Sequence, residues 1–260
     1  MTNEKTEIAE KKETSISTFD DNLLSGGTGL EETTTEDFAI PFIRVLQPMS
    51  PQLNKQHGKY VEGAGQGDLY NTVTGEAYDG AKGISIVPCA YTKKFIEWVP
   101  REKGGGLVNA NHDISILNSC TRDGESRRYF TKEGNEIVET AQFFVLVVNG
   151  DVAQQAVIAF TSTQLGVARK WLTMLRMARV QNSKGLSVEA PMFAYTYSLA
   201  TTTQSNDKGS WNGYTISQEG ATELSVAMMA KDFMSAARSG DVQVKEEQQQ
   251  DVANAANEAF

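Results

Sequence analysis

Runs of apolar residues bounded by turn residues occupy the middle of this chain and predict its strands. One long run covers 83–99, and two more cover 140–148 and 152–160. The last two runs are joined by Asn149-Gly150, a pair that supplies the positive φ of a tight hairpin turn. The run at 140–148 is apolar at consecutive positions, so we expect a central strand with both faces buried.

Shorter segments predict the remaining strands. Residues 69–78 are expected to form a hairpin, and 127–130 a short strand. Residues 193–202 and 211–217 predict a further hairpin, with several turn-forming residues between its strands. Because short turns join strands only in the antiparallel sense, these segments favour an antiparallel sheet.

Helical periodicity appears at three places. Residues 162–180 predict the longest helix, and 221–237 predict a last helix that ends at Gly240. The segment 38–46 is expected to be a short helix, with Pro41 in its first turn. Antiparallel hairpins combined with two or three helices predict an α+β fold, built on a curved sheet or an OB-like barrel.

The two ends of the chain differ from its middle in composition. Residues 1–36 and 240–260 are polar and acidic, with too few large apolar groups to offset the entropy of ordering. We therefore expect two disordered acidic tails around a single α+β core domain at 37–239. The net charge is −9, and the tails hold so many of the acids that the core is mildly basic. This asymmetry suits a nucleic-acid-binding protein, and it equally suits an ordinary domain with solubilising tails.

Patterns typical of enzymes and metal sites do not appear. His57 and His112 lie outside any nucleophile motif, and Cys89 and Cys120 lie far apart with no Cys-x-x-Cys. The segment 75–82 departs from a P-loop because its Lys does not directly follow the second Gly. We expect a non-enzymatic protein without cofactor, metal or disulfide. The cysteine usage and the lack of a membrane-spanning run favour the host cell cytoplasm.

Basic and aromatic residues occur together at three places, in 91–101, 127–130 and 208–211, and the helix at 162–180 is basic without a single acid. Cations neutralise phosphates and rings stack on bases, so these clusters predict a surface for single-stranded nucleic acid. The alternative for each is a charged sheet edge, a solvated helix face or core packing. The candidate nucleic-acid-binding residues are Lys93, Lys94, Phe95, Trp98, Arg101, Arg127, Arg128, Tyr129, Phe130, Arg169, Lys170, Arg176, Arg179, Lys208 and Trp211. Some of these aromatic residues must instead belong to the core.

An acidic C-terminal tail that ends in Phe resembles the tails of single-stranded DNA-binding proteins of bacteria and phages. Over about 38–217 the chain is also similar to a tailed-phage single-stranded DNA-binding protein family. The stretches that carry this similarity are IPFIRVLQ (40–47), SPQL (50–53), NTVTGE (71–76), IEWVPR (96–101) and SNDKGSW (205–211).

This resemblance implies an OB-like fold and non-sequence-specific binding of single-stranded DNA in phage replication or recombination. It also implies that the tail gates the DNA groove and contacts replication or recombination proteins through Asp251, Glu258 and Phe260. Two other functions stay open: a phage protein–protein interaction or virion component that binds no DNA, and a single-strand annealing recombinase. The sequence leaves open whether the chain forms a homo-oligomer and whether it prefers DNA or RNA.

Overall fold

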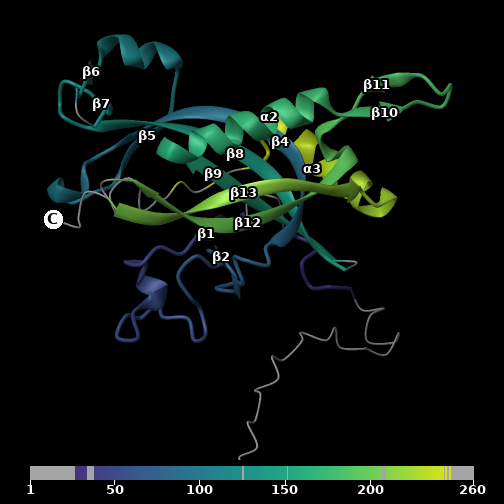
Figure 1. Ribbon diagram of the computed structural model, residues 1–260, viewed down its shortest axis with the longest axis horizontal. Coiled ribbons are helices and arrows are strands. Elements are labelled where there is room, and N and C mark those ends of the chain that lie inside the picture. The colour runs from purple at the N-terminus through teal and green to yellow at the C-terminus, as the bar shows by residue number, and fades with distance from the viewer. Residues whose placement is uncertain are drawn as a thin grey trace, which may run out of the picture.

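The computed structural model describes residues 27–33, 38–124, 126–150, 152–206, 209–242, 244 and 246 (Figure 1). Its strands are β1 Ile43–Val45, β2 Leu69–Asn71, β3 Ala77–Tyr78, β4 Ile84–Trp98, β5 Leu107–His112, β6 Thr121–Arg122, β7 Tyr129–Phe130, β8 Glu136–Asn149, β9 Val152–Thr161, β10 Arg179–Gln181, β11 Ser187–Glu189, β12 Tyr195–Asn206 and β13 Gly209–Ala221. Its α-helices are α2 Leu165–Met177 and α3 Leu224–Ser239. Short 3-10 helices are η2 Pro51–Leu53, η3 Arg101–Lys103, η4 Ile114–Ser119, η5 Ser162–Gln164 and η6 Met192–Ala194.

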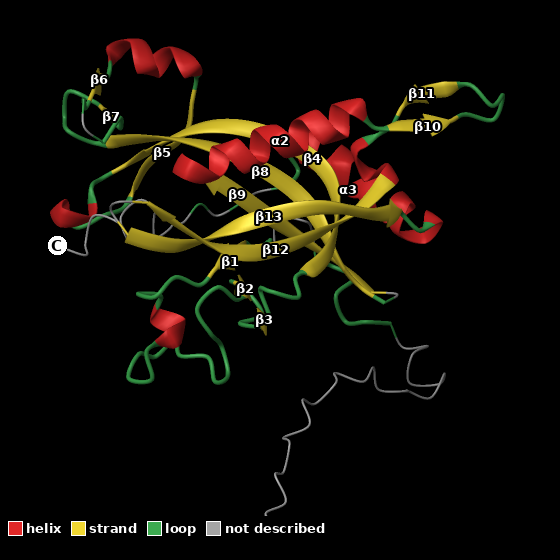
Figure 2. Ribbon diagram, viewed as in Figure 1, coloured by secondary structure: helices red, strands yellow, loops and turns green. Residues whose placement is uncertain are grey.

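The fold is built on the antiparallel pair β4 and β8. These strands pair along almost their whole length, from Ser85 opposite Val148 to Trp98 opposite Glu136. β9 and β7 extend the sheet beyond β8, while β12 and β5 pair with the two ends of β4, and β13 follows β12. The sheet is strongly curled (Figure 2), which confirms the α+β prediction with a curved antiparallel sheet.

β1 lies where the two outer strands of the curled sheet approach each other. The residue before it, Phe42, forms a parallel bridge with Val157 of β9. On the other side, the Tyr214 hydroxyl of β13 donates a hydrogen bond to the carbonyl of Ile43 at 2.8 Å. β1 therefore connects β9 to β13 and gives the sheet its barrel-like closure.

Helix α2 fills the inner face of this curled sheet. Ala168, Trp171 and Leu175 are spaced for one face of a helix, and all three are buried against the sheet. The Trp171 ring stacks on Phe143 of β8 at 4.2 Å and meets Tyr197 of β12 edge-on. α2 thus places the Trp171 ring among the aromatic side chains of the inner face of the sheet.

The opposite, outer face of the sheet is covered by α3 (Figure 1). Val226, Ala230 and Phe233 form its buried stripe, and Phe233 contacts Phe144 of β8 edge-on at 6.0 Å. The helix ends at Gly240, whose φ of 86° is the left-handed conformation predicted for this position. Within the described residues, neither α2 nor α3 is long and apolar enough to cross a membrane.

A bulge in β4 decides which face its later residues occupy. The register with β8 shifts between Pro88 and Ala90, a place where proline is tolerated because it has no amide hydrogen to donate. Beyond the bulge, Tyr91 faces the inner core beside Phe143. By alternation Lys93 lies on the inner face and Lys94 on the outer one.

Several predicted elements are confirmed, and others are wrong in detail. The hairpin at 69–78 and the Asn149-Gly150 hairpin are both present, with Gly150 at a φ of 58°. The short helix predicted at 38–46 is wrong: Ile43–Val45 is a strand, because β-branched residues fit the place between β9 and β13. The predicted helix at 162–180 is interrupted at both ends, by η5 before it and by β10 after Met177.

Replacing Trp171 with alanine should destabilise the protein by about 3–5 kcal/mol, because it leaves a large cavity between α2 and the sheet. Urea unfolding followed by circular dichroism measures this loss. Met177 on the same helix is 71% exposed, so its alanine variant is the matched control and should change stability by less than about 0.5 kcal/mol. Equal effects of the two substitutions would contradict the packing described for α2.

Candidate nucleic-acid interface

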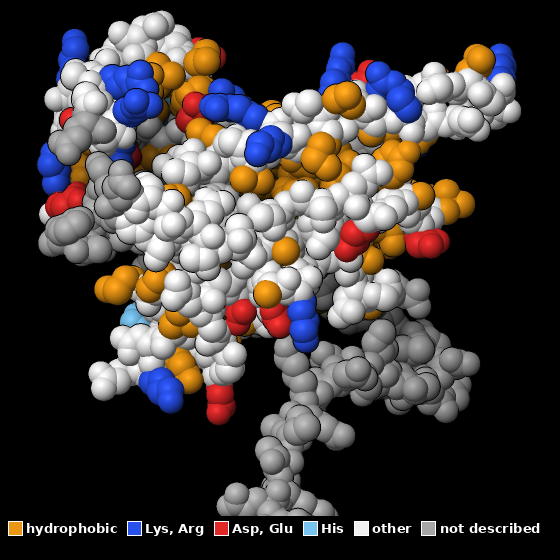
Figure 3. All heavy atoms as spheres, in the orientation of Figure 1, with side chains coloured by type: hydrophobic (Ala, Val, Ile, Leu, Met, Phe, Trp, Pro, Cys, Tyr) orange, Lys and Arg blue, Asp and Glu red, His pale blue; other side chains and the backbone are white. Residues whose placement is uncertain are grey.

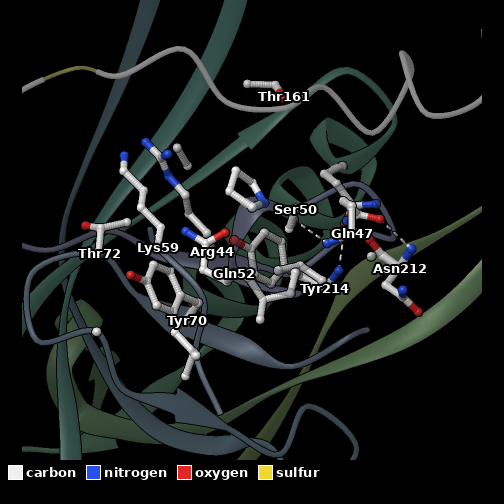
Figure 4. A pocket seen from close by; sticks show the side chains of 18 of the residues that line it. Arg44, Gln47, Ser50, Gln52, Lys59, Tyr70, Thr72, Thr161, Asn212 and Tyr214 are labelled. Atoms are coloured by element: carbon white, nitrogen blue, oxygen red, sulfur yellow. Dashed lines mark hydrogen bonds between the residues drawn. The ribbon is translucent and has the colours of Figure 1, made fainter. Parts of the chain in front are cut away.

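A cavity of about 740 Å³ lies between the segment 44–75 and the ends of β9 and β13 (Figure 4). Its lining residues are Arg44, Val45, Leu46, Gln47, Ser50, Pro51, Gln52, Lys59, Tyr60, Val61, Tyr70, Thr72, Gly75, Arg101, Ala159, Thr161, Gln164, Asn212, Gly213 and Tyr214. We call this cavity the cleft. Three of the described residues that line it are cationic, and none is an aspartate or glutamate.

The β1–β2 pairing brings the first cation and ring of the cleft together. Arg44 of β1 and Tyr70 of β2 are directly opposite each other in the antiparallel register, so their side chains lie on the same face. Figure 4 shows Arg44 and Lys59 extending in the same direction, on the side of the cleft where Tyr70 lies. The Arg44 guanidinium also lies 5.2 Å from the centre of the Phe42 ring.

Lys59 and Tyr60 are held by a loop that folds back on η2. The amide of Val61 donates to the carbonyl of Gln52 at 2.9 Å, which closes the loop. Within it, Nδ1 of His57 accepts a hydrogen bond from the amide of Lys59 at 3.1 Å. Each of these bonds fixes backbone that a loop without helix or strand would otherwise leave mobile.

Arg101 enters the cleft from a different part of the chain. It is the first residue of η3, directly after Pro100 at the end of the β4 segment. The turn back into β5 passes through Gly104, Gly105 and Gly106, all with positive φ, a conformation that glycine adopts without strain. This tight return leaves Arg101 among the cleft residues while β5 pairs with β4.

Amide side chains form the opposite wall of the cleft. Gln47 makes two hydrogen bonds with the backbone of Asn212. Nε2 of Gln47 donates to the carbonyl of Asn212 at 2.8 Å, and the backbone amide of Asn212 donates to Oε1 of Gln47 at 3.1 Å. Oε1 of Gln164 accepts from the amide of Tyr214 at 2.9 Å. Burial raises the pKa of the Tyr214 hydroxyl, so it stays a neutral donor to Ile43 at every physiological pH. This wall is rigid, and sequence patterns gave no sign of it.

A second group of cations lies on and beside helix α2, and we call it the α2 ridge. Arg169, Lys170 and Arg176 belong to α2 itself, Lys93 to β4 and Arg179 to β10. Figure 3 shows Lys and Arg side chains gathered over α2 and the β10–β11 arm. Two carboxylates partly neutralise the ridge: Glu139 lies 2.7 Å from Lys93 and 4.0 Å from Arg169, and Glu189 lies 2.8 Å from Arg176.

The predicted aromatic residues divide between core and surface. Phe95, Trp98 and Trp211 are buried, and Trp211 donates its indole hydrogen to Gln204 at 2.9 Å. Some of the candidate rings were predicted to belong to the core, and these three do. Because they are buried, a base cannot stack on Phe95, Trp98 or Trp211. Tyr129 and Phe130 of β7 are half-buried, which leaves part of each ring accessible.

The predicted cations are spread over several surfaces. Arg101 lies in the cleft and the α2 cations on the ridge. Lys94 instead pairs with Glu246 at 2.8 Å on the outer face of the sheet. Arg128 pairs with Glu136 at 3.5 Å near β7, and Arg127 beside it is exposed. Lys208, Asp251, Glu258 and Phe260 lie outside the described residues.

Four cleft residues escaped the sequence analysis: Arg44, Lys59, Tyr60 and Tyr70. Each is a single cation or ring in an ordinary local context, and only the β1–β2 register and the loop closure bring them together. The described part of the chain places no group of three or more His, Cys, Asp or Glu side chains where they could hold a metal ion.

Comparison with known proteins identifies a family for this chain. No curated protein and no solved structure matches the chain. A family model described as Pam3 phage gp34-like protein matches residues 10–243, which covers both faces of the sheet, the cleft and both helices. The chain therefore belongs to the Pam3 phage gp34-like protein family.

Proposed function

We propose that the protein binds single-stranded nucleic acid without sequence preference, with single-stranded DNA in phage replication or recombination as its ligand. The cleft is its principal site. The observation that carries this proposal is the cleft lining, whose described residues include three cations and two half-buried tyrosines, Tyr60 and Tyr70, but no aspartate or glutamate. We infer that it acts by binding alone and catalyses no reaction.

The chemistry of the cleft suits a single strand. Arg44, Lys59 and Arg101 supply charge for phosphates, and tyrosine rings stack on any base because every base has a π face. A cavity of about 740 Å³ is of the size that holds a drug-sized molecule, hence a few unpaired bases rather than a double helix. The curled antiparallel sheet and the phage family are compatible with this role.

The α2 ridge offers the strand further phosphate contacts. α2 begins directly after Gln164, which lines the cleft, and its cations follow along the helix from there. At about 1.5 Å per residue, Arg176 lies about 18 Å further along the helix axis than Gln164. The ridge carries no aromatic ring among its defining residues, so its share of the affinity is electrostatic.

The acidic C-terminal tail supplies a gate for the same interactions. Residues 247–260 contain Glu247, Asp251 and Glu258 and no cation. They follow Glu246, which contacts Gln142 two positions from Thr140, and Thr140 pairs with Thr161 of the cleft. Glu246 thus contacts the strand that pairs with Thr161 at the edge of the cleft, and the carboxylates that follow it would compete with the ligand for the cleft cations. Partner proteins of replication or recombination would contact the tail, with Phe260 as an apolar anchor.

Cleft variants test the proposal by fluorescence anisotropy of a labelled oligothymidylate at two salt concentrations. Tyr70→Leu removes a stacking ring and should weaken binding by about 1–3 kcal/mol. Lys59→Gln should lower the slope of log affinity against log salt by about 1, because one phosphate contact is lost. Lys82→Gln is the matched control, since Lys82 is exposed and outside the cleft lining, and it should change neither value.

The two alternatives give different results in these experiments. No salt-dependent binding by the wild type, or equal behaviour of Lys59→Gln and Lys82→Gln, would refute the cleft as a nucleic-acid site. The first result would favour a phage protein–protein interaction or virion component. Faster annealing of complementary strands, with ring or filament assembly, would favour a recombinase.

Deleting residues 247–260 should tighten binding of the oligothymidylate several-fold at low salt, because the competing carboxylates are removed. The gain should shrink as salt rises, since screening weakens the tail and the ligand alike. A variant with Glu247, Asp251 and Glu258 all changed to Gln keeps the tail length and should reproduce the gain. Unchanged affinity in both variants would contradict the gate.

A further inference from the structure

The outer face of the sheet contains two polar side chains, Gln142 and Lys94, at positions where alternation along the strands would place apolar residues. Gln142 of β8 is fully buried, and its face also carries Phe144 and Leu146 under α3. Lys94 of β4 lies diagonally across from Gln142, because it pairs with Thr140, two residues before Gln142 on β8. Burying an amide beside aromatic and aliphatic groups is costly unless it finds a partner.

The partner is the carboxylate of Glu246. Nε2 of Gln142 donates to both carboxylate oxygens, at 2.8 and 2.9 Å, and Nζ of Lys94 lies 2.8 Å from Oε1. The Glu246 side chain is 5% exposed and the Lys94 side chain is 20% exposed, so the ion pair between Lys94 and Glu246 is well shielded from water. Charge-assisted hydrogen bonds of this length are among the stronger polar contacts in proteins.

Two aliphatic residues precede this carboxylate at alternating positions. Val242 and Val244 both pack against the apolar cluster that α3 covers, next to the polar pair. Val242, Val244 and Glu246, which occupy every second position of this segment, each contact the outer face of the sheet. The segment follows Gly240, whose left-handed conformation turns the chain out of α3 and back to the sheet.

We propose that this outer face is a binding site for an extended peptide with two aliphatic residues and a carboxylate at alternating positions. Its occupant is this chain's own segment 242–246, which the site binds reversibly. Lys94 and Gln142 are the carboxylate receptor, so Lys94 serves to anchor the tail rather than to contact phosphate. Release of Glu246 from this receptor would also release Val242 and Val244 from the apolar cluster.

Trypsin cleavage of the full chain tests this site without any nucleic acid. Lys245 is the sole Lys or Arg after Arg238 in the sequence, so cleavage after it reports release of the anchor. Cleavage after Lys170 in α2 reports global unfolding in the same digest. Lys94→Met should raise the rate at Lys245, relative to Lys170, about tenfold, as expected for loss of one charge-assisted hydrogen bond.

Lys93→Met is the matched control, because Lys93 is the neighbouring residue but pairs with Glu139 on the inner face. It should leave the ratio of the two rates unchanged. Gln142→Leu, which keeps the side chain buried but removes the amide, should act like Lys94→Met. The same ratio in Lys94→Met and Lys93→Met would overturn the proposal. A protein that binds no DNA would still give the expected result, so this test stands apart from the cleft experiments.

Discussion

The connection that β1 makes between β9 and β13 is the constraint on which the cleft depends. A curled sheet leaves a gap between its outer strands, and here the gap is bridged by the Tyr214 hydroxyl on Ile43 and by the Gln47–Asn212 bonds. These bonds are buried, so breaking one would leave polar groups without partners in the core. Because β2 and the loop that precedes it are attached through β1, the same bridge positions the cations and rings of the cleft.

The central pair β4–β8 assigns its neighbouring residues to two different tasks. The bulge at Pro88 sets the alternation, so that consecutive lysines point to opposite faces. Lys93 joins Glu139 and Arg169 beside α2, on the side of the ridge. Lys94 meets Glu246 beside α3. One sheet thereby places Lys93 among the cations of the α2 ridge and Lys94 beside Glu246, on opposite faces.

Local determinants made much of the fold predictable. The Asn149-Gly150 turn, the left-handed Gly240 and the apolar runs of β4 and β8 depend on a few adjacent residues, and these predictions are confirmed. The segment 38–46 was mistaken for a helix because its apolar spacing is ambiguous over so few residues. Its strand conformation comes from β9 and β13, which lie far away in the sequence.

The candidate site was less accessible to sequence reasoning. A cation beside a ring in one stretch, as in 91–101, suggested a binding surface, but the alternation of the strand buries Phe95 and Trp98. The cleft instead combines Arg44, Tyr70 and Arg101 from separate segments. Only the β1–β2 register and the return of the chain after β4 bring them together. Tertiary contacts of this kind leave no trace in a local pattern.

The most direct measurement is photocrosslinking of the full chain to an oligothymidylate that carries a photoreactive thymidine analogue, with the crosslinked residue identified by mass spectrometry. Stacking in the cleft predicts crosslinks at Tyr60 or Tyr70, lost in excess unlabelled single strand and retained in excess duplex. Crosslinks confined to α2 or to β7, with none in the segment 44–75, would contradict the cleft as the place where the strand binds.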